Sequence, residues 1–140
     1  MQETRAVPLT SQKHSTGRQV AAWLEKRLGA ERVFYAGLPS HPQHALAAKQ
    51  MSGFGGMISV EMGTKEHANT VLTRVKVFSL AESLGGVESL ISHPASMTHA
   101  SVELDRRKVL GVTEGLIRLS VGVEDVEDLL ADVEQAFKGY

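Results

Sequence analysis

The feature that most constrains this chain is an amphipathic stretch at its C-terminal end. Val126, Leu129, Leu130, Val133 and Phe137 recur at helical spacing and form one apolar stripe on a helix expected from about Asp125. Acidic residues gather at its start and a lysine lies near its end, as the helix dipole favours. A helix with one apolar face must bury that face against another element. We expect residues 116–121 to form the strand that it covers.

Alternation along that strand singles out one arginine. Ile117, Leu119 and Val121 point to one face, which matches the apolar stripe of the following helix. Arg118 therefore projects from the opposite face, with Ser120 as a possible neighbouring donor. A guanidinium in that position is suited to a bidentate grip on a carboxylate. The residues alone favour the simpler interpretation, an arginine on a solvated sheet face.

The remaining pattern predicts an α+β fold, a small two-layer domain with a mostly antiparallel sheet and helices on one face. Residues 1–14 are polar and are expected to form an irregular lead-in, and residues 15–140 a single domain. Apolar spacing predicts helices at about 16–28, 42–50, 65–74 and 104–110, and strands at 32–35, 58–62 and 77–80. Pro42 is expected at the first position of its helix, and Gly29 at the end of the first one. Residues 81–100 hold Gly85-Gly86, Pro94 and several hydroxyls, and we assign no element to them.

Composition excludes several classes of function. The 140 residues carry a formal net charge of −1 with scattered basic residues, which argues against a nucleic-acid partner. No apolar run approaches the roughly 20 residues of a membrane-spanning helix. The chain has no cysteine and no apolar signal region after Met1, so we expect a cytoplasmic protein without disulfides.

Two further chemistries receive little support. Ser83 lies in Ala-Glu-Ser-Leu-Gly, close to the G-x-S-x-G nucleophile motif, but the last histidine, His99, precedes the acid Asp105. His41 and His44 are three residues apart, but Pro42 prevents one helix face from presenting both. We therefore expect neither a serine nucleophile nor a metal site. The glycine-rich residues 53–56 precede a strand rather than a helix, so we interpret them as a turn.

Five motifs, taken in order, resemble a known family. They are GLPSHPQH (37–44), QMSGFGGM (50–57), FSLAESLGGVESL (78–90), HPASMTHAS (93–101) and LIRLSVGVEDVED (116–128). They resemble cystathionine γ-lyase and its relatives, the pyridoxal phosphate (PLP)-dependent enzymes of cysteine and methionine metabolism, over residues 15–138. In that family this region is the C-terminal domain of a PLP fold-type I enzyme, packed on a larger PLP-binding domain.

The resemblance implies roles for four residues. Arg118 corresponds to the arginine that binds the α-carboxylate of the substrate. Glu82 and Ser83 correspond to residues near the substrate side chain and the cofactor lysine, and Thr98 to a threonine that lines the site. PLP chemistry also needs a Schiff-base lysine, an aspartate and phosphate donors. The family places these in the large domain, and none of the seven lysines here has a Ser-x-Thr-Lys-like context. We expect no catalytic, cofactor-binding or metal-binding residue in this chain.

Three hypotheses follow from the resemblance. The chain is the C-terminal part of a carbon–sulfur lyase or synthase of trans-sulfuration, not catalytic alone. It is one subunit of a split enzyme whose PLP domain is a separate polypeptide. Or it is a non-enzymatic domain that binds a small carboxylate or dimerises. The first two imply a PLP-binding large domain and an amino-acid substrate as partners, and self-association wherever the docking face stays exposed.

Overall fold

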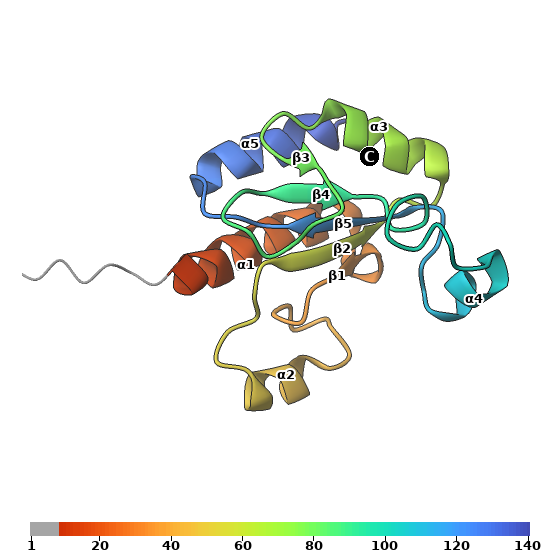
Figure 1. The fold of residues 1–140 in the computed structure, drawn as a ribbon. Coiled ribbons are helices and arrows are strands. Elements are labelled where there is room, and N and C mark those ends of the chain that lie inside the picture. The colour runs from red at the N-terminus through yellow and green to blue at the C-terminus, as the bar shows by residue number, and fades with distance from the viewer. Residues whose placement is uncertain (1–8) are drawn as a thin grey trace, which may run out of the picture.

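The computed structural model describes residues 9–140, which contain a five-stranded sheet (Figure 1). The strands in chain order are β1 (Val33–Phe34), β2 (Met57–Glu61), β3 (Ser79–Leu80), β4 (Leu90–Ser92) and β5 (Leu116–Ser120). Their order across the sheet is β1-β2-β5-β4-β3. Every neighbouring pair is antiparallel except β3 and β4, which are parallel. The predicted mostly antiparallel α+β fold is confirmed.

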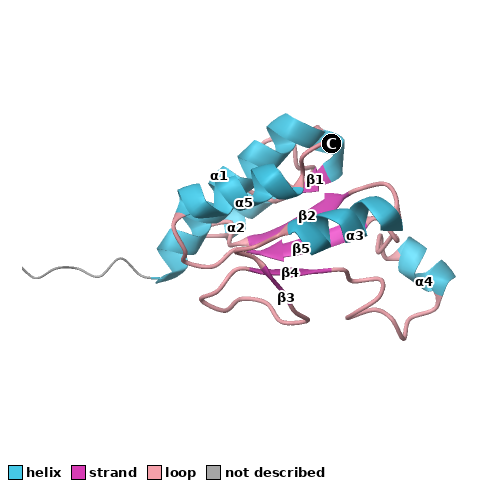
Figure 2. Cartoon of the chain, turned by 90° about the horizontal axis from the view of Figure 1, so that it is seen from above, coloured by secondary structure: helices cyan, strands magenta, loops and turns pink. Residues whose placement is uncertain are grey.

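Three helices cover one face of this sheet (Figure 2). They are α1 (Leu9–Leu28), α3 (Lys65–Arg74) and α5 (Val126–Ala136), and α5 packs against both of the others. Thr64 caps α3 by accepting from the backbone N–H of His67 at 3.1 Å, and Asp125 caps α5 by accepting from Glu127 at 2.8 Å. Gly29, with φ of 99°, follows the end of α1 as predicted.

The core lies between the sheet and these helices. Strand residues that face the helices are fully buried, namely Ile58, Val60, Ile91, Ile117 and Leu119. Helix residues that meet them are equally buried, including Val20, Leu24, Val71, Leu129, Val133 and Phe137. The expected apolar stripe of α5 and the expected inward face of β5 are therefore both confirmed.

Two short helices lie away from the covered face (Figure 1). Helix α2 (His44–Gln50) belongs to the long connection between β1 and β2, and α4 (Leu104–Val109) precedes β5. A 3-10 turn, η1 (Ala30–Arg32), leads into β1. Neither α2 nor α4 contains a buried residue.

The start of α1 corrects the expected boundary. The helix begins at Leu9, so residues 9–14 are helical rather than an irregular lead-in; residues 1–8 lie outside the described part. Tertiary contacts hold these polar turns: Gln12 Nε2 donates to the Val123 carbonyl at 2.8 Å, and Lys13 Nζ to the Gly85 carbonyl at 2.6 Å. The spacing of apolar residues gives no information about such polar contacts, so the start of α1 was predicted too late in the sequence.

Strand β4 and the bounds of two other elements also differ from expectation. Residues 90–92 form β4 inside the segment to which the sequence assigned no element. The strand was not predicted because all three of its side chains are buried and therefore show no alternation of polar and apolar residues. Helix α2 begins at His44 rather than Pro42, and β3 covers only residues 79–80 of the expected 77–80.

Candidate functional site

The helix-free face of the sheet presents one row of side chains around Arg118. In register, Phe34 pairs with Ser59, Ser59 with Arg118, and Arg118 with Ser92, so the row crosses four strands. Residues paired directly across antiparallel strands project from the same face. This places Arg118 where the alternation of β5 predicted it, on the face away from the core.

Arg118 and Ser92 both lack a protein partner. Within residues 9–140 the half-buried side chain of Arg118 makes no hydrogen bond and no salt bridge. The Ser92 hydroxyl, in a residue that is 2% exposed, also has no hydrogen-bond partner. A buried polar group without a partner is costly, so the Ser92 hydroxyl is a place where an ordered water or a ligand would be stabilising. A forked cation beside a hydroxyl matches the two oxygens of a carboxylate.

The connection between the parallel strands β3 and β4 carries Glu82 and Ser83. Both side chains are exposed. The Gly85 N–H donates to Ser120 Oγ at 2.9 Å, which attaches the loop to β5 two residues from Arg118. Gly85 has φ of 76°, a conformation that favours glycine. The loop therefore lies against the end of the strand that bears Arg118.

Thr98 lies in the turns that follow β4. It is exposed, and its hydroxyl is hydrogen-bonded to His99 Nδ1 at 2.8 Å. The buried ring of His93 anchors the same turns, with Nε2 2.7 Å from the Glu114 carbonyl and Nδ1 2.6 Å from Ser96 Oγ. Thr98 is thus connected to β4 by the chain and, through His93 and Glu114, to the segment that leads into β5.

The four expected residues come from three segments: Arg118 from β5, Glu82 and Ser83 from the β3–β4 loop, and Thr98 from the turns after β4. Within the described range, no hydrogen bond or salt bridge links Arg118 to Glu82, Ser83 or Thr98. Ser59 and Ser92, the neighbours of Arg118, were missed by the sequence analysis. They become visible only once the strand register is known, because no local pattern marks a serine that faces an arginine across a sheet.

The glycine-rich segment 53–56 is a turn, as interpreted. The Gly55 N–H donates to His14 Nδ1 at 2.7 Å, and its carbonyl accepts from the Tyr35 hydroxyl at 2.8 Å. Burial raises the pKa of Tyr35 above 10.0, an effect that the nearby Arg18 charge partly opposes. His41 and His44 also bond backbone groups of their own connection, at the Gln43 N–H and the Ala36 carbonyl.

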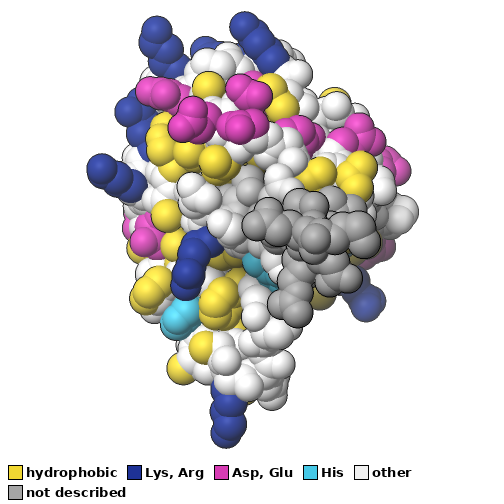
Figure 3. All heavy atoms as spheres, turned by 90° about the vertical axis from the view of Figure 1, so that its left-hand side faces the viewer, with side chains coloured by type: hydrophobic (Ala, Val, Ile, Leu, Met, Phe, Trp, Pro, Cys, Tyr) yellow, Lys and Arg dark blue, Asp and Glu magenta, His cyan; other side chains and the backbone are white. Residues whose placement is uncertain are grey.

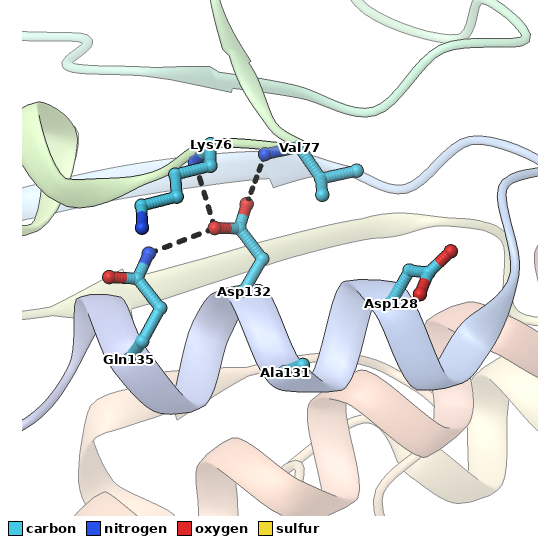
Figure 4. Close-up of a pocket in the computed structure, with 6 residues that line it drawn as sticks. All are labelled: Lys76, Val77, Asp128, Ala131, Asp132 and Gln135. Atoms are coloured by element: carbon cyan, nitrogen blue, oxygen red, sulfur yellow. Dashed lines mark hydrogen bonds between the residues drawn. The ribbon is translucent and has the colours of Figure 1, made fainter.

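A second concave region lies between α5 and the segment before β3 (Figure 4). This pocket of about 270 Å³ is lined by Lys76, Val77, Asp128, Ala131, Asp132 and Gln135. Asp132 is buried there and accepts from the backbone N–H groups of residues 76, 77 and 78 at 2.8, 2.8 and 2.9 Å. Gln135 Nε2 donates to it as well, at 2.9 Å. Because this carboxylate is already satisfied, we interpret it as a structural cap that joins α5 to β3.

The charged surface follows the helix dipole. Acidic side chains gather on the face of the molecule where α5 begins (Figure 3); Asp125 is the N-cap of this helix, and Glu127 and Asp128 lie in its first turn. Among the described residues, no helix combines the length and apolar character needed to cross a membrane.

A Schiff-base lysine needs a desolvated, unprotonated amine. Lys13 is half-buried and donates its Nζ to the Gly85 carbonyl. The other six lysines are exposed.

Fold and site together define a small α+β unit whose helix-free sheet face carries an arginine that makes no side-chain hydrogen bond or salt bridge within residues 9–140. Comparison with known proteins gives this class a family. The model of the Cys/Met metabolism PLP-dependent enzymes matches residues 4–138, and the chain belongs to that family. This confirms the resemblance seen in the motifs.

Individual relatives agree. The chain is 59% identical over 119 residues to a cystathionine beta-lyase of Coxiella burnetii, covering 84% of this chain and 31% of the relative. It is 52% identical over 121 residues to a cystathionine gamma-lyase of Bacillus subtilis, covering 86% and 32%. The crystal structure of metB from Corynebacterium glutamicum superposes with a TM-score of 0.84 at 49% identity, covering 91% of this chain and 33% of that one. This chain therefore spans about a third of the length of these relatives.

Proposed function

We propose that this chain is the C-terminal, substrate-carboxylate-binding domain of a PLP-dependent enzyme that acts on sulfur amino acids. The observation that carries the proposal is the unpartnered Arg118 beside the unpartnered Ser92 on the uncovered face of the sheet. The names of the relatives, cystathionine beta-lyase and gamma-lyase, support a carbon–sulfur bond of a similar amino acid as the target.

In this proposal each residue of the helix-free face has a part in binding. Arg118 holds the α-carboxylate through both of its forked N–H donors. Glu82 and Ser83, on the loop attached to Ser120, face the substrate side chain, and Thr98 lines the rim. PLP, when bound, supplies an electron sink for the carbanion that forms next to the amino group. The lysine and phosphate donors for PLP belong to a partner domain.

Exposed apolar side chains support a partner domain that covers this region. Phe34, in the row of Arg118, is 46% exposed, and Leu80, Leu84 and Val87 around the 82–88 loop are each more than half exposed. Isolated surface hydrophobics are common, but a group of them around a candidate site is typical of an interface. The partner is the PLP-binding large domain, either in the same polypeptide or as a separate subunit.

A chimera tests this proposal directly. Residues 9–140 replace the matching third of the Bacillus subtilis cystathionine gamma-lyase, and carbon–sulfur lyase activity and KM are measured with cystathionine. We expect an active enzyme in which Arg118→Ala raises KM about 10- to 150-fold, since a charge-assisted hydrogen bond contributes about 1.5–3 kcal/mol. Arg118→Lys should recover only part of that loss, because an ammonium lacks the forked geometry.

Arg106→Ala is the matched control, since Arg106 is an exposed arginine on α4. It should leave KM within about twofold, as surface substitutions usually do. An active chimera whose KM responds equally to Arg118→Ala and Arg106→Ala would refute the assignment of Arg118. A correctly folded but inactive chimera would count against the family activity for this domain.

A further inference from the structure

The loop 82–88 is unusually well held for an exposed segment. All of its residues are exposed, and it joins two parallel strands without a helix. Such a connection has little packing of its own, so its position must come from specific polar contacts. Three of these contacts lie within the loop: Gly85 bonds Ser120 and Lys13, and the Val87 carbonyl accepts from the Val123 N–H at 2.9 Å.

The strongest attachment lies where the loop enters β4. Ser89 is completely buried, and both of its donors point to the carboxylate of Glu124. The Ser89 N–H lies 2.6 Å from Glu124 Oε1, and the Ser89 hydroxyl lies 2.7 Å from Oε2. The same hydroxyl accepts from the Gly122 N–H at 2.8 Å. Every donor of Ser89 is therefore satisfied by the turn that follows β5.

Gly122 shows how closely the two segments approach. A Cβ at this position would lie 2.3 Å from the Val87 carbonyl oxygen and 2.6 Å from the Glu88 carbonyl carbon. Both are backbone atoms, which cannot move aside without displacing the loop. In the turn between β5 and α5, Gly122 therefore lets the loop backbone approach closely, and the Glu124 carboxylate binds Ser89 through both of its oxygens.

We propose that Glu124, acting through Ser89, is a positioning residue that holds the 82–88 loop, with Glu82 and Ser83, against the end of the strand that carries Arg118. Within residues 9–140 no hydrogen bond or salt bridge joins Arg118 to Glu82 or Ser83, so their relative position depends on how the loop is attached to β5 and to the turn after it. The hydrogen bonds between Ser89 and Glu124 hold the loop in a fixed position relative to β5. Its consequence for catalysis rests on the proposed function; the attachment itself does not.

Hydrogen exchange of the 140-residue chain tests the attachment without substrate or cofactor. The amide of Gly85 is the reporter, because its own acceptor, Ser120 Oγ, is untouched by a change at Glu124. We expect Glu124→Gln and Ser89→Ala to speed exchange at Gly85 and Val123 about 10- to 100-fold, with no change at Ile117 or Leu119 in the sheet. Glu127→Gln, an equivalent change at an exposed position of α5, should alter none of these amides.

The chimera provides the kinetic readout. Glu124→Gln should lower kcat roughly 10- to 100-fold by displacing the loop residues, while the affinity for a simple amino acid held by Arg118 stays within about twofold. A purely structural role would instead loosen the whole sheet and lower the amount of folded enzyme. Unchanged exchange at Gly85, exchange raised equally in the core strands, or a kcat equal to that of Glu127→Gln would each overturn the proposal.

The two proposals fail separately. If Arg118→Ala leaves KM unchanged while Glu124→Gln exposes the Gly85 amide, the assignment of Arg118 is wrong and the attachment stands. If Arg118→Ala raises KM and Glu124→Gln leaves Gly85 protected, the carboxylate site stands and Glu124 has no positioning role.

Discussion

The two faces of one sheet differ in what completes them. On the helix-covered face, Ile58, Ile117 and Leu119 are fully buried and need nothing beyond this chain. On the other face, the side chains of Arg118 and Ser92 make no hydrogen bond within residues 9–140, and Phe34 remains 46% exposed. Adjacent residues of β5, Arg118 and Leu119, therefore face an uncovered side and a finished core. The contrast indicates that folding depends on one set of alternate residues of this strand, which leaves the other set free for the proposed binding.

The largest effect is expected for a substitution in the core, on the helix-covered face of the sheet. Leu119→Ala should lower the free energy of unfolding by about 2–5 kcal/mol, because it removes buried methyl groups and leaves a cavity. Arg118→Ala, one residue away, should change it by no more than about 0.5 kcal/mol. Urea unfolding followed by circular dichroism measures both. Similar losses for the two variants would mean that Arg118 is part of the folded core.

The next largest effect on the free energy of unfolding tests whether Asp132, in the pocket beside α5, stabilises the fold. Asp132→Ala leaves the backbone N–H groups of residues 76–78 without their acceptor. We expect a loss of about 2–4 kcal/mol, since unsatisfied buried donors are costly. Asp128→Ala, on the same pocket wall but exposed, serves as the control. Equal stability of the two variants would contradict the structural role of Asp132.

These core predictions also show how far the sequence reached. The elements with regular apolar spacing, α3, β5 and α5, were predicted within about a residue of their bounds. The three-residue strand β4 was not, because fully buried residues show no alternation. The early start of α1 was missed because tertiary hydrogen bonds from Gln12 and Lys13 stabilise its polar turns.

The site divides in the same way. Arg118 could be placed on the helix-free face from alternation alone, since the next helix supplies the matching apolar stripe. Ser92 and Ser59 required the register of three strands, which no short pattern encodes. Ser89 and Glu124 are 35 residues apart, and only the folded structure shows that they meet. The roles of Glu82, Ser83 and Thr98 remain predictions from the family.

A smaller effect concerns the turn near the first strand. Tyr35→Phe should cost about 0.5–1.5 kcal/mol near neutral pH, because the Gly55 carbonyl loses its donor. Burial raises the pKa of Tyr35 in the folded state, so the folded protein keeps this proton to higher pH than the unfolded chain does. Its stabilising contribution is present below pH 10.0 and declines as the pH rises through the folded pKa.

Unfolding measured from neutral to alkaline pH tests this sign. The wild-type protein should lose more stability above pH 10.0 than Tyr35→Phe does. A smaller alkaline loss in the wild type than in Tyr35→Phe would contradict the direction of the pKa shift.

The smallest effect concerns association through the uncovered side. Leu84 and Val87 are 51% and 58% exposed, and we expect the chain alone to self-associate weakly and to bind a hydrophobic dye. Leu84→Ser with Val87→Ser should reduce both, whereas Val109→Ser, at an 86% exposed position on α4, should not. Sedimentation at high concentration measures the association, and dye fluorescence measures the exposed apolar surface. A wild-type chain that stays monomeric and binds no dye would refute this prediction.

The most direct test of the central claim pairs Arg118 with the carboxylate that it is expected to bind. In the chimera, inhibition constants are measured for an amino acid and for its carboxamide, with Arg118 and with Arg118→Ala. We predict that Arg118→Ala weakens binding of the acid about 10- to 150-fold and changes binding of the amide by no more than about threefold. The effects of removing the arginine and of removing the carboxylate are then not additive, as expected for two groups in direct contact. Equal weakening of acid and amide, or no weakening of either, would contradict the account.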